Sequence, residues 1–118
     1  MKDFRQLKVW EKAHALTLLT YNLSKVFPKE ELYGLTSQLR RAVSSIPTNI
    51  AEGCGRTTLE FRHFLQIAMG SASEVEYLLV LSHDLKIIND SEYEDFSNRV
   101  VEVKKMISSL ILKLKADH

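Results

Sequence analysis

Two Glu-x-x-His pairs are the residues of this chain best spaced for metal chemistry. Glu11 with His14, and Glu60 with His63, place a carboxylate and an imidazole one helical turn apart. Carboxylate di-iron bundles use two such pairs together with one glutamate from each of two further helices. Here the apolar spacing directs both pairs away from the predicted core, and the other helices place no acid in their core stripes. The sequence therefore predicts no metal site and no cofactor.

Nucleophilic catalysis has little support in the sequence. The only cysteine, Cys54, lies between Gly53 and Gly55 near the expected end of a helix, where the helix dipole disfavours a thiolate. The nearby serines have no histidine base in the same segment, and no Walker-type or dinucleotide glycine motif occurs. We predict no catalytic residue, and therefore a protein that is not an enzyme.

Four arginines form a candidate nucleic-acid-binding site. The guanidinium group suits bidentate phosphate contacts, and repetition of a modest patch around an oligomer would add avidity. The alternative is that Arg41 and Arg56 pair with Glu52 or Glu74 and stabilise subunit contacts. The candidate nucleic-acid-binding residues are Arg40, Arg41, Arg56 and Arg62.

Composition limits the classes of protein to consider. The 118 residues suffice for one domain, predicted to span 1–118, and 45% hydrophobic with 26% charged residues is typical of a soluble globular chain. Sixteen basic and fifteen acidic residues give a net charge of +1, whereas dedicated nucleic-acid binders usually carry a larger basic excess. We see no signal pattern and no apolar run near the roughly 20 residues that span a bilayer. With a single cysteine, these features predict a cytoplasmic protein that does not bind membranes.

The first helix is apolar on two sides. Asp3 and Gln6 have capping-box spacing and predict a helix that runs to about Val26, before Pro28. One side predicts a bundle core, and a four-helix bundle would leave the other side uncovered. We therefore expect an oligomer; the alternative is that Trp10 and Tyr21 only cover the edge of a neighbouring helix. The core stripe is Val9, Ala13, Leu16, Thr20, Leu23 and Phe27. The second stripe, our candidate oligomer interface, is Leu7, Trp10, His14, Leu18 and Tyr21.

The second helix, within residues 35–56, carries an apolar stripe that stays in phase past Pro47. Because proline lacks an N–H, we expect a kinked helix rather than two helices. Gly53 is predicted to be the C′ residue that ends it. Ser44 and Ser45 are candidates for satisfying backbone groups that the proline leaves open. The opposite face is polar and includes Arg41, Asn49 and Glu52, with no role that the sequence assigns.

Two further helices complete the pattern. Thr57 with Glu60 predicts the start of the third, Asn89 its left-handed end, and Ser91 with Glu94 the start of the fourth. The third contains Gly70 within a run of small residues, which predicts either the close approach of another helix or a kink. The third-helix core stripe is Phe61, Phe64, Leu65, Ala68, Ala72, Val75 and Leu79, widened by Ile67, Leu78 and Leu85. The fourth-helix stripe is Tyr93, Phe96, Val100, Val103, Ile107, Leu110 and Leu114.

Several sequence motifs up to about Leu85 occur together in one known family. These motifs are Phe4, Leu7, Val9-Trp10, Ala13, Phe27-Pro28, Tyr33-Gly34, residues 35–42, Ser45-Ile46-Pro47, Asn49 to Gly53, Arg56, residues 64–68, Gly70-Ser71 and Glu74. With them, the sequence resembles the 23S ribosomal-RNA intervening-sequence proteins, a family of bacterial four-helix bundles. That resemblance implies an up-and-down bundle that assembles as a homopentamer, without a settled activity. The structural-motif residues it marks are Pro47, Asn49, Glu52, Gly53, Gly70 and Glu74.

A similar group suggests a second possible role. The accessory proteins of diversity-generating retroelements resemble this family and associate with a reverse transcriptase and nucleic acid. The resemblance implies a ring with a basic surface for those accessory proteins, whereas this chain is almost neutral.

The sequence as a whole predicts an all-α protein, an up-and-down four-helix bundle with a proline-kinked second helix. The predicted function is that of a non-enzymatic homo-oligomeric module that presents a ring surface to a protein or nucleic-acid partner. The alternative is an RNA- or DNA-binding accessory protein that uses the arginines around the second helix.

Overall fold

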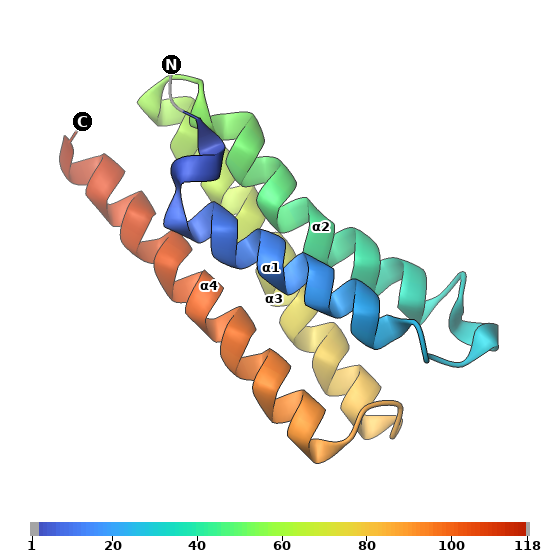
Figure 1. The fold of residues 1–118 in the computed structure, drawn as a ribbon. Helices are drawn as coiled ribbons and strands as arrows, with labels where there is room; N and C mark the ends of the chain where they lie inside the picture. The colour runs from blue at the N-terminus through green and yellow to red at the C-terminus, as the bar shows by residue number, and fades with distance from the viewer. Residues whose placement is uncertain (1–2, 118) are drawn as a thin grey trace.

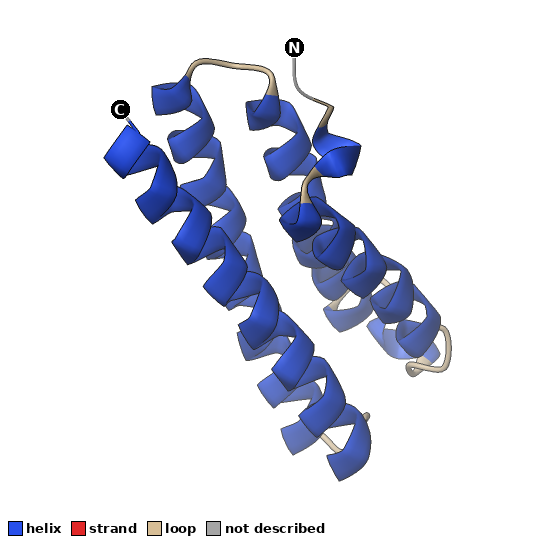
Figure 2. Cartoon of the chain, turned by 60° about the vertical axis from the view of Figure 1, so that its left-hand side comes forward, coloured by secondary structure: helices blue, strands red, loops and turns tan. Residues whose placement is uncertain are grey.

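Figure 1 shows the computed structural model of the chain, in which long helices run up and down beside one another. It describes residues 3–117, without the side chain of Asp117. Two 3-10 helices, η1 (Phe4–Gln6) and η2 (Lys29–Glu31), precede α1 and α2. No strand occurs within residues 3–117 (Figure 2), which confirms the predicted all-α four-helix fold. The long helices are α1 (Lys8–Ser24), α2 (Leu35–Cys54), α3 (Thr58–Asp84) and α4 (Asp90–Asp117).

The core is one connected cluster of apolar side chains from all four long helices. It contains the predicted stripe of α1 from Val9 to Leu16 and the centre of the α4 stripe from Phe96 to Ile107. Full burial of one large aliphatic side chain stabilises the fold by about 1.5–3 kcal/mol, so these stripes determine which face of each helix turns inward. The prediction was wrong for Ile67 and Leu85, which remain 40% and 53% exposed.

The N-terminus differs from the sequence prediction. Asp3 does not begin α1: its carboxylate accepts a hydrogen bond from the Arg5 N–H (2.9 Å) and caps η1 instead. Leu7 is extended, with φ −81° and ψ 125°, and the long helix begins only at Lys8. It ends at Ser24, two residues before the predicted end at Val26. The break at Leu7 allows η1 to pack against α1 and α2.

The start of α3 agrees with prediction, but the start of α4 does not. Thr57 and Glu60 form the predicted reciprocal capping box. The box of α4 begins at Asn89 rather than Ser91: the Asn89 side chain accepts from the Glu92 N–H (2.8 Å), and the Glu92 carboxylate accepts from the Asn89 N–H (2.9 Å). Ser91 is therefore already inside the helix.

Lys86, not Asn89, takes the left-handed conformation that ends α3. Its φ is 62°, and its N–H donates to the His83 carbonyl at 2.9 Å. The Ile87 N–H donates to the Ser82 carbonyl, also at 2.9 Å. These two bonds form a Schellman motif, which satisfies carbonyl groups at the helix end.

Gly53 and Gly70 lie in very different surroundings. The prediction that Gly53 ends α2 was wrong, because Gly53 is a buried residue inside a helix that continues to Cys54. A Cβ atom at this position would lie 2.7 Å from the Cβ of Phe64, so a side chain here would collide with α3. Gly70 is exposed, and a Cβ atom added there would meet nothing within 4 Å. No other helix of this subunit makes the close approach predicted there.

The composition of α3 needs a separate explanation. Among the described residues, it is the one helix long and apolar enough to cross a membrane by length and composition. Its inner face supplies core residues such as Leu65, Ala68 and Val75, all fully buried. We therefore attribute its apolar character to its position between α2 and α4, both of which it contacts.

Candidate functional site

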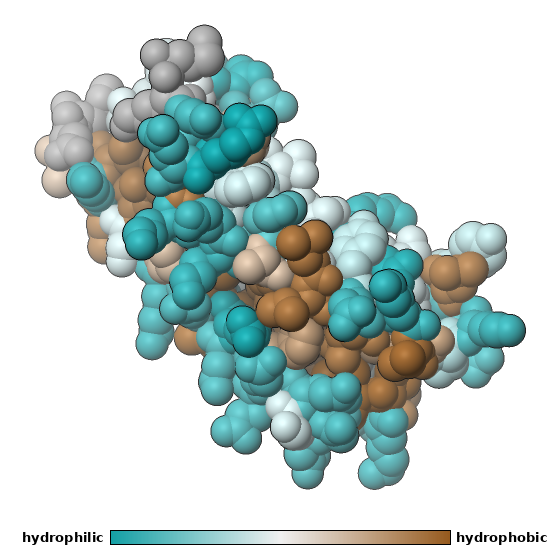
Figure 3. Space-filling view, viewed as in Figure 1, coloured by the Kyte–Doolittle hydropathy of each residue, from teal (hydrophilic) through white to brown (hydrophobic). Residues whose placement is uncertain are grey.

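The outer face of α1, defined by the second stripe Leu7, Trp10, His14, Leu18 and Tyr21, is the candidate interaction surface. Leu18 is 59% exposed and Tyr21 41% exposed, although both are large apolar side chains. Trp10 and Leu7 are only partly covered, and His14 is exposed. Figure 3 shows apolar side chains reaching the surface on the side of the molecule that α1 occupies. The subunit thus buries one stripe of α1 and leaves much of the other in water.

Trp10 is the centre of an aromatic cluster on this face. Its ring stacks on His14, with centroids 4.8 Å apart, and Phe4 of η1 meets it edge-on at 4.9 Å. The break at Leu7 brings Phe4 into this position. Phe4 and His14 therefore cover part of the Trp10 ring within the subunit. Leu18 and Tyr21 are the less covered part of the outer face.

A groove of about 1110 Å³ lies between α1 and α2 beside this cluster. Trp10 and His14 form one wall, and the outer face of α2 supplies a floor of small residues that includes Ser44, Thr48 and Ala51. Arg56 and Glu52 lie at one end. Short side chains directed back to their own helix leave space open along this floor.

Hydrogen bonds fold the α2 side chains onto their own backbone. Thr48 donates to the Ser44 carbonyl (2.7 Å), and Asn49 donates to the Ser45 carbonyl (2.8 Å). The Ser45 hydroxyl also lies 2.8 Å from the Ser71 hydroxyl of α3. The polar face of α2 is therefore largely a surface whose groups are already paired.

The helix α2 continues through Pro47, and the carbonyl that the proline leaves without its helical donor lies beside a hydroxyl of α1 that is shared between two carbonyl groups. Pro47 cannot donate to the Val43 carbonyl. The Thr17 hydroxyl of α1 lies 3.2 Å from that oxygen and 2.8 Å from the Ala13 carbonyl. The prediction that Ser44 or Ser45 would satisfy this group was wrong, since the Ser44 hydroxyl donates to the Arg41 carbonyl and the Ser45 hydroxyl meets that of Ser71.

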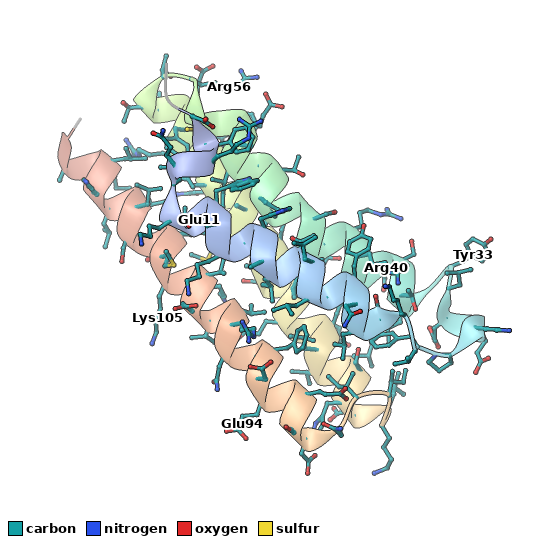
Figure 4. All side chains as sticks on the ribbon, in the orientation of Figure 1. Glu11, Tyr33, Arg40, Arg56, Glu94 and Lys105 are labelled. Atoms are coloured by element: carbon teal, nitrogen blue, oxygen red, sulfur yellow. The ribbon has the colours of Figure 1, made fainter. Side chains whose placement is uncertain are left out.

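The four candidate arginines do not form one cluster. Figure 4 shows Arg40 and Arg56 near opposite ends of α2, sixteen positions apart, or about 24 Å along a helix. Arg40 donates to the Ser24 hydroxyl (2.8 Å) and lies over the Tyr21 ring at 5.0 Å. Its guanidinium therefore connects α2 to α1.

Arg56 makes the pairing that the alternative interpretation expected. Its guanidinium lies 2.9 Å from Glu52 and 3.9 Å from Glu60, and 5.0 Å from the Phe64 ring. The hydrogen bond with Glu52 raises the pKa of Arg56 above its ordinary value. Hydrogen bonds from the Thr57 side chain and backbone lower the pKa of Glu60, so this carboxylate stays charged.

The remaining two arginines differ in exposure. Arg62 is partly buried, and its Nε has no hydrogen-bond partner among the described residues. Arg41 is exposed on the outer face of α2 and forms no ion pair with the side chains described for residues 3–116. Arg41 is thus the candidate whose charge is most available to a partner.

The Glu-x-x-His pairs are not brought together. Glu11 and His14 lie exposed on α1, and His14 is stacked on Trp10. Glu60 is occupied in the capping box of α3, and His63 is exposed beyond it. Within the part of the chain that the structure describes, no three His, Cys, Asp or Glu side chains are placed to hold a metal ion. Cys54 is buried at the end of α2.

Comparison with known proteins identifies the family. The 23S rRNA-intervening sequence protein family matches residues 5–109. The chain belongs to this family. A crystal structure of a protein with unknown function from the S23 ribosomal protein family of Bacteroides thetaiotaomicron VPI-5482 has the same fold, with a TM-score of 0.81 and 30% identity. The match covers 87% of this chain and 94% of that one. No curated protein matches the chain.

The resemblance predicted from the sequence motifs is thereby confirmed. The family assignment and the fold agree with each other, and neither brings an activity with it, because the solved relative is itself described as having unknown function.

Proposed function

We propose that this member of the 23S rRNA-intervening sequence protein family is a non-enzymatic homo-oligomeric module. Its subunits associate through the outer face of α1, and the ring that they form presents a surface to a partner. Five subunits is the number that the family resemblance implies, and it is the number that we propose.

The observation that carries this proposal is the unequal burial of the two sides of α1. On the core side, Ala13 and Leu16 are 0% and 2% exposed, whereas Leu18 is 59% exposed on the outer side. The outer face is also continuous with Trp10 and the groove beside it. An apolar stripe of this kind, beside a groove with a floor of small residues, supports burial against another subunit.

Light scattering after size exclusion tests the proposal. Leu18→Glu should reduce the mass to that of a smaller species, because it places a charge in the interface while touching no core residue. Leu59→Glu is the matched control, since Leu59 is 61% exposed but lies on α3, and it should leave the mass unchanged. A wild-type protein that stays monomeric at high concentration would exclude the ring.

The alternative function, an RNA- or DNA-binding accessory protein, is supported by one specific observation. Arg41 is exposed on α2 without an ion pair to the described side chains, so a phosphate would not have to displace a carboxylate there. Arg40 and Arg56 have partners inside the subunit, which leaves fewer free cations than the sequence suggested.

A salt titration distinguishes this alternative. If the protein binds single-stranded RNA through Arg41, Arg41→Ala should weaken the affinity for RNA. It should also make log affinity depend less steeply on log salt, with a change in slope that corresponds to about one phosphate contact per subunit. Lys29→Ala, which removes an exposed cation from η2, is the control and should leave that slope unchanged. Absence of RNA binding at low salt would eliminate the alternative.

A further inference from the structure

Two grooves lie along the line where α1 meets α4, here called the α1–α4 seam. One lies between the start of α1 and the second half of α4, has a volume of about 400 Å³, and is lined by apolar residues including Leu7, Met106 and Leu110. The other lies between the end of α1 and the start of α4, has a volume of about 500 Å³, and is lined by Leu19, Leu23 and other residues. The seam is thus incompletely packed at both ends.

The first groove exists because α1 begins late. A helix starting at Asp3, as predicted, would continue along α4, but the chain breaks at Leu7 and η1 packs on α2 instead. The second half of α4 therefore loses the cover that a longer α1 would have given, and Leu110 stays partly exposed.

The two grooves carry opposite charges. Three lysines line the first, Lys8, Lys105 and Lys113, all exposed and without an ion pair to the side chains described for residues 3–116. Glu92 and Asp95 line the second, and Asp90 and Glu94 are close to them in the sequence. Asp95 pairs with Arg99 at 3.2 Å and Asp90 lies 2.7 Å from His83, so the second groove has an acidic excess although two of these carboxylates have partners. Figure 4 shows Lys105 and Glu94 on the two halves of α4.

An ion pair lies between the two grooves. Lys12 of α1 and Glu102 of α4 are 3.6 Å apart, and both side chains are 52% exposed. Along α4, Asp95 precedes Glu102 by seven residues and Lys113 follows it by eleven, which corresponds to about 10 Å and about 16 Å. A basic apolar groove, a central pair and an acidic apolar groove therefore follow one another along the seam.

We propose that the α1–α4 seam docks on the same seam of a second copy of this chain, in antiparallel orientation. A two-fold axis near Glu102 would place the lysine-lined groove of each subunit on the acidic groove of the other. In such a contact, the same patch serves both subunits, which requires a surface complementary to itself. The inversion of charge across the seam supplies that complementarity, and the apolar groove floors supply area to bury.

This contact is separate from the outer face of α1 and adds to it. A two-fold contact joins two subunits, so it doubles the mass of a monomer. In a ring every subunit carries the seam, so the same contact joins rings to one another. Exposed ion pairs are weak and are screened by salt, so the doubling should be strongest at low ionic strength.

Charge reversal with a mixing step tests the inference. Lys105→Glu with Lys113→Glu makes the first groove acidic like the second. Ser91→Lys with Asp95→Lys places lysines in the second groove, so that both grooves carry them, and leaves the Asn89–Glu92 capping box intact. The series is made in the Leu18→Glu background, where the unreversed protein should be a dimer. Each seam variant alone should be a monomer by light scattering at about 0.1 M salt, where screening extends over about 10 Å. An equimolar mixture of the two variants should restore the dimer, because acidic seams then meet basic ones.

A control on α3 tests whether added charge away from the seam changes the mass. Gln66→Lys with Ser73→Lys adds two positive charges at exposed positions of α3, a helix without close backbone contacts to α1, and should stay a dimer. The four proteins should have equal helical circular dichroism, which reports folding independently of mass. Unchanged mass in both seam variants, or a mixture that stays monomeric, would overturn the inference. Because the Leu18→Glu background lacks the ring contact, this result is independent of the ring.

Discussion

Along the α2–α3 contact, the helices approach so closely that Gly53 has no space for a methyl group, whereas the α1–α4 seam leaves two grooves open. The connections across the two contacts differ in the same way. The Ser45 and Ser71 hydroxyls meet at 2.8 Å in a partly buried position, but Lys12 and Glu102 meet at 3.6 Å in water. The α2–α3 contact is closely packed within the subunit, whereas the α1–α4 seam leaves apolar groove surface exposed. We therefore expect mutations at the first to change stability and those at the second to change association.

The largest effect is expected at Gly53. Gly53→Ala places a Cβ 2.7 Å from the Phe64 Cβ and 3.0 Å from the Phe61 Cδ1, so α2 and α3 must separate. Overpacking of this kind should lower the free energy of unfolding by about 2–3 kcal/mol. Urea unfolding at one fixed protein concentration measures it, since subunit association also contributes to apparent stability.

Gly70→Ala is the control for the same exchange. Its methyl group would meet no atom within 4 Å, so the substitution should raise stability by about 0.5–1 kcal/mol through helix propensity alone. Equal effects at the two glycines would show that the difference in packing between them has been misjudged.

A smaller loss is expected between α1 and α2. Thr17→Val keeps the shape of the side chain but removes the hydroxyl that reaches the Val43 carbonyl, which Pro47 cannot serve. Leaving that carbonyl without a partner should cost about 1–2 kcal/mol in thermal or urea unfolding. Thr48→Val, in which the lost hydroxyl lies on the exposed face of α2, should stay within about 0.5 kcal/mol of wild type. A Thr17→Val protein as stable as Thr48→Val would mean that the Val43 carbonyl needs no donor from α1.

These comparisons also show what the sequence could and could not predict. Apolar spacing located the core faces, because the 3.6-residue period alone determines which residues share a side of a helix. The capping box of Thr57 and Glu60 was also predictable, because its two partners are only three residues apart in the sequence. Asn89 and Glu92 have the same spacing, but Ser91 with Glu94 offered an equally good pattern two residues later.

Long-range contacts were the part that the sequence did not reveal. Nothing near Pro47 indicates that Thr17, thirty residues earlier, satisfies the Val43 carbonyl. The period places Gly53 in phase with Ile46 and Ile50, but it does not show that Phe64 lies directly against Gly53. For the candidate site, the outer stripe of α1 was predictable, and so was the separation of Arg40 from Arg56 along one helix. The hydrogen bond from Arg40 to Ser24 and the break at Leu7 required the structure.

The partly buried hydroxyl pair of the α2–α3 contact should contribute a moderate amount. A double-mutant cycle with Ser45→Ala and Ser71→Ala should give a coupling of about 1 kcal/mol, because the two groups are partly removed from water. The coupling should not change with salt, since neither group is charged. A coupling near zero would indicate that water replaces the bond and that close helix packing alone holds this contact together.

The smallest effect is expected for the ion pair of the α1–α4 seam. The Lys12→Ala and Glu102→Ala cycle should give at most about 0.5 kcal/mol within one subunit, because both side chains are half exposed at 3.6 Å. The informative measurement is its dependence on concentration. If the seam docks on a second copy, diluting the protein until the two copies separate should lower the coupling energy between Lys12 and Glu102. The reason is that both side chains become more exposed to water when the second copy leaves. A coupling that is equal at both concentrations, while the mass changes twofold, would place the association somewhere other than this seam.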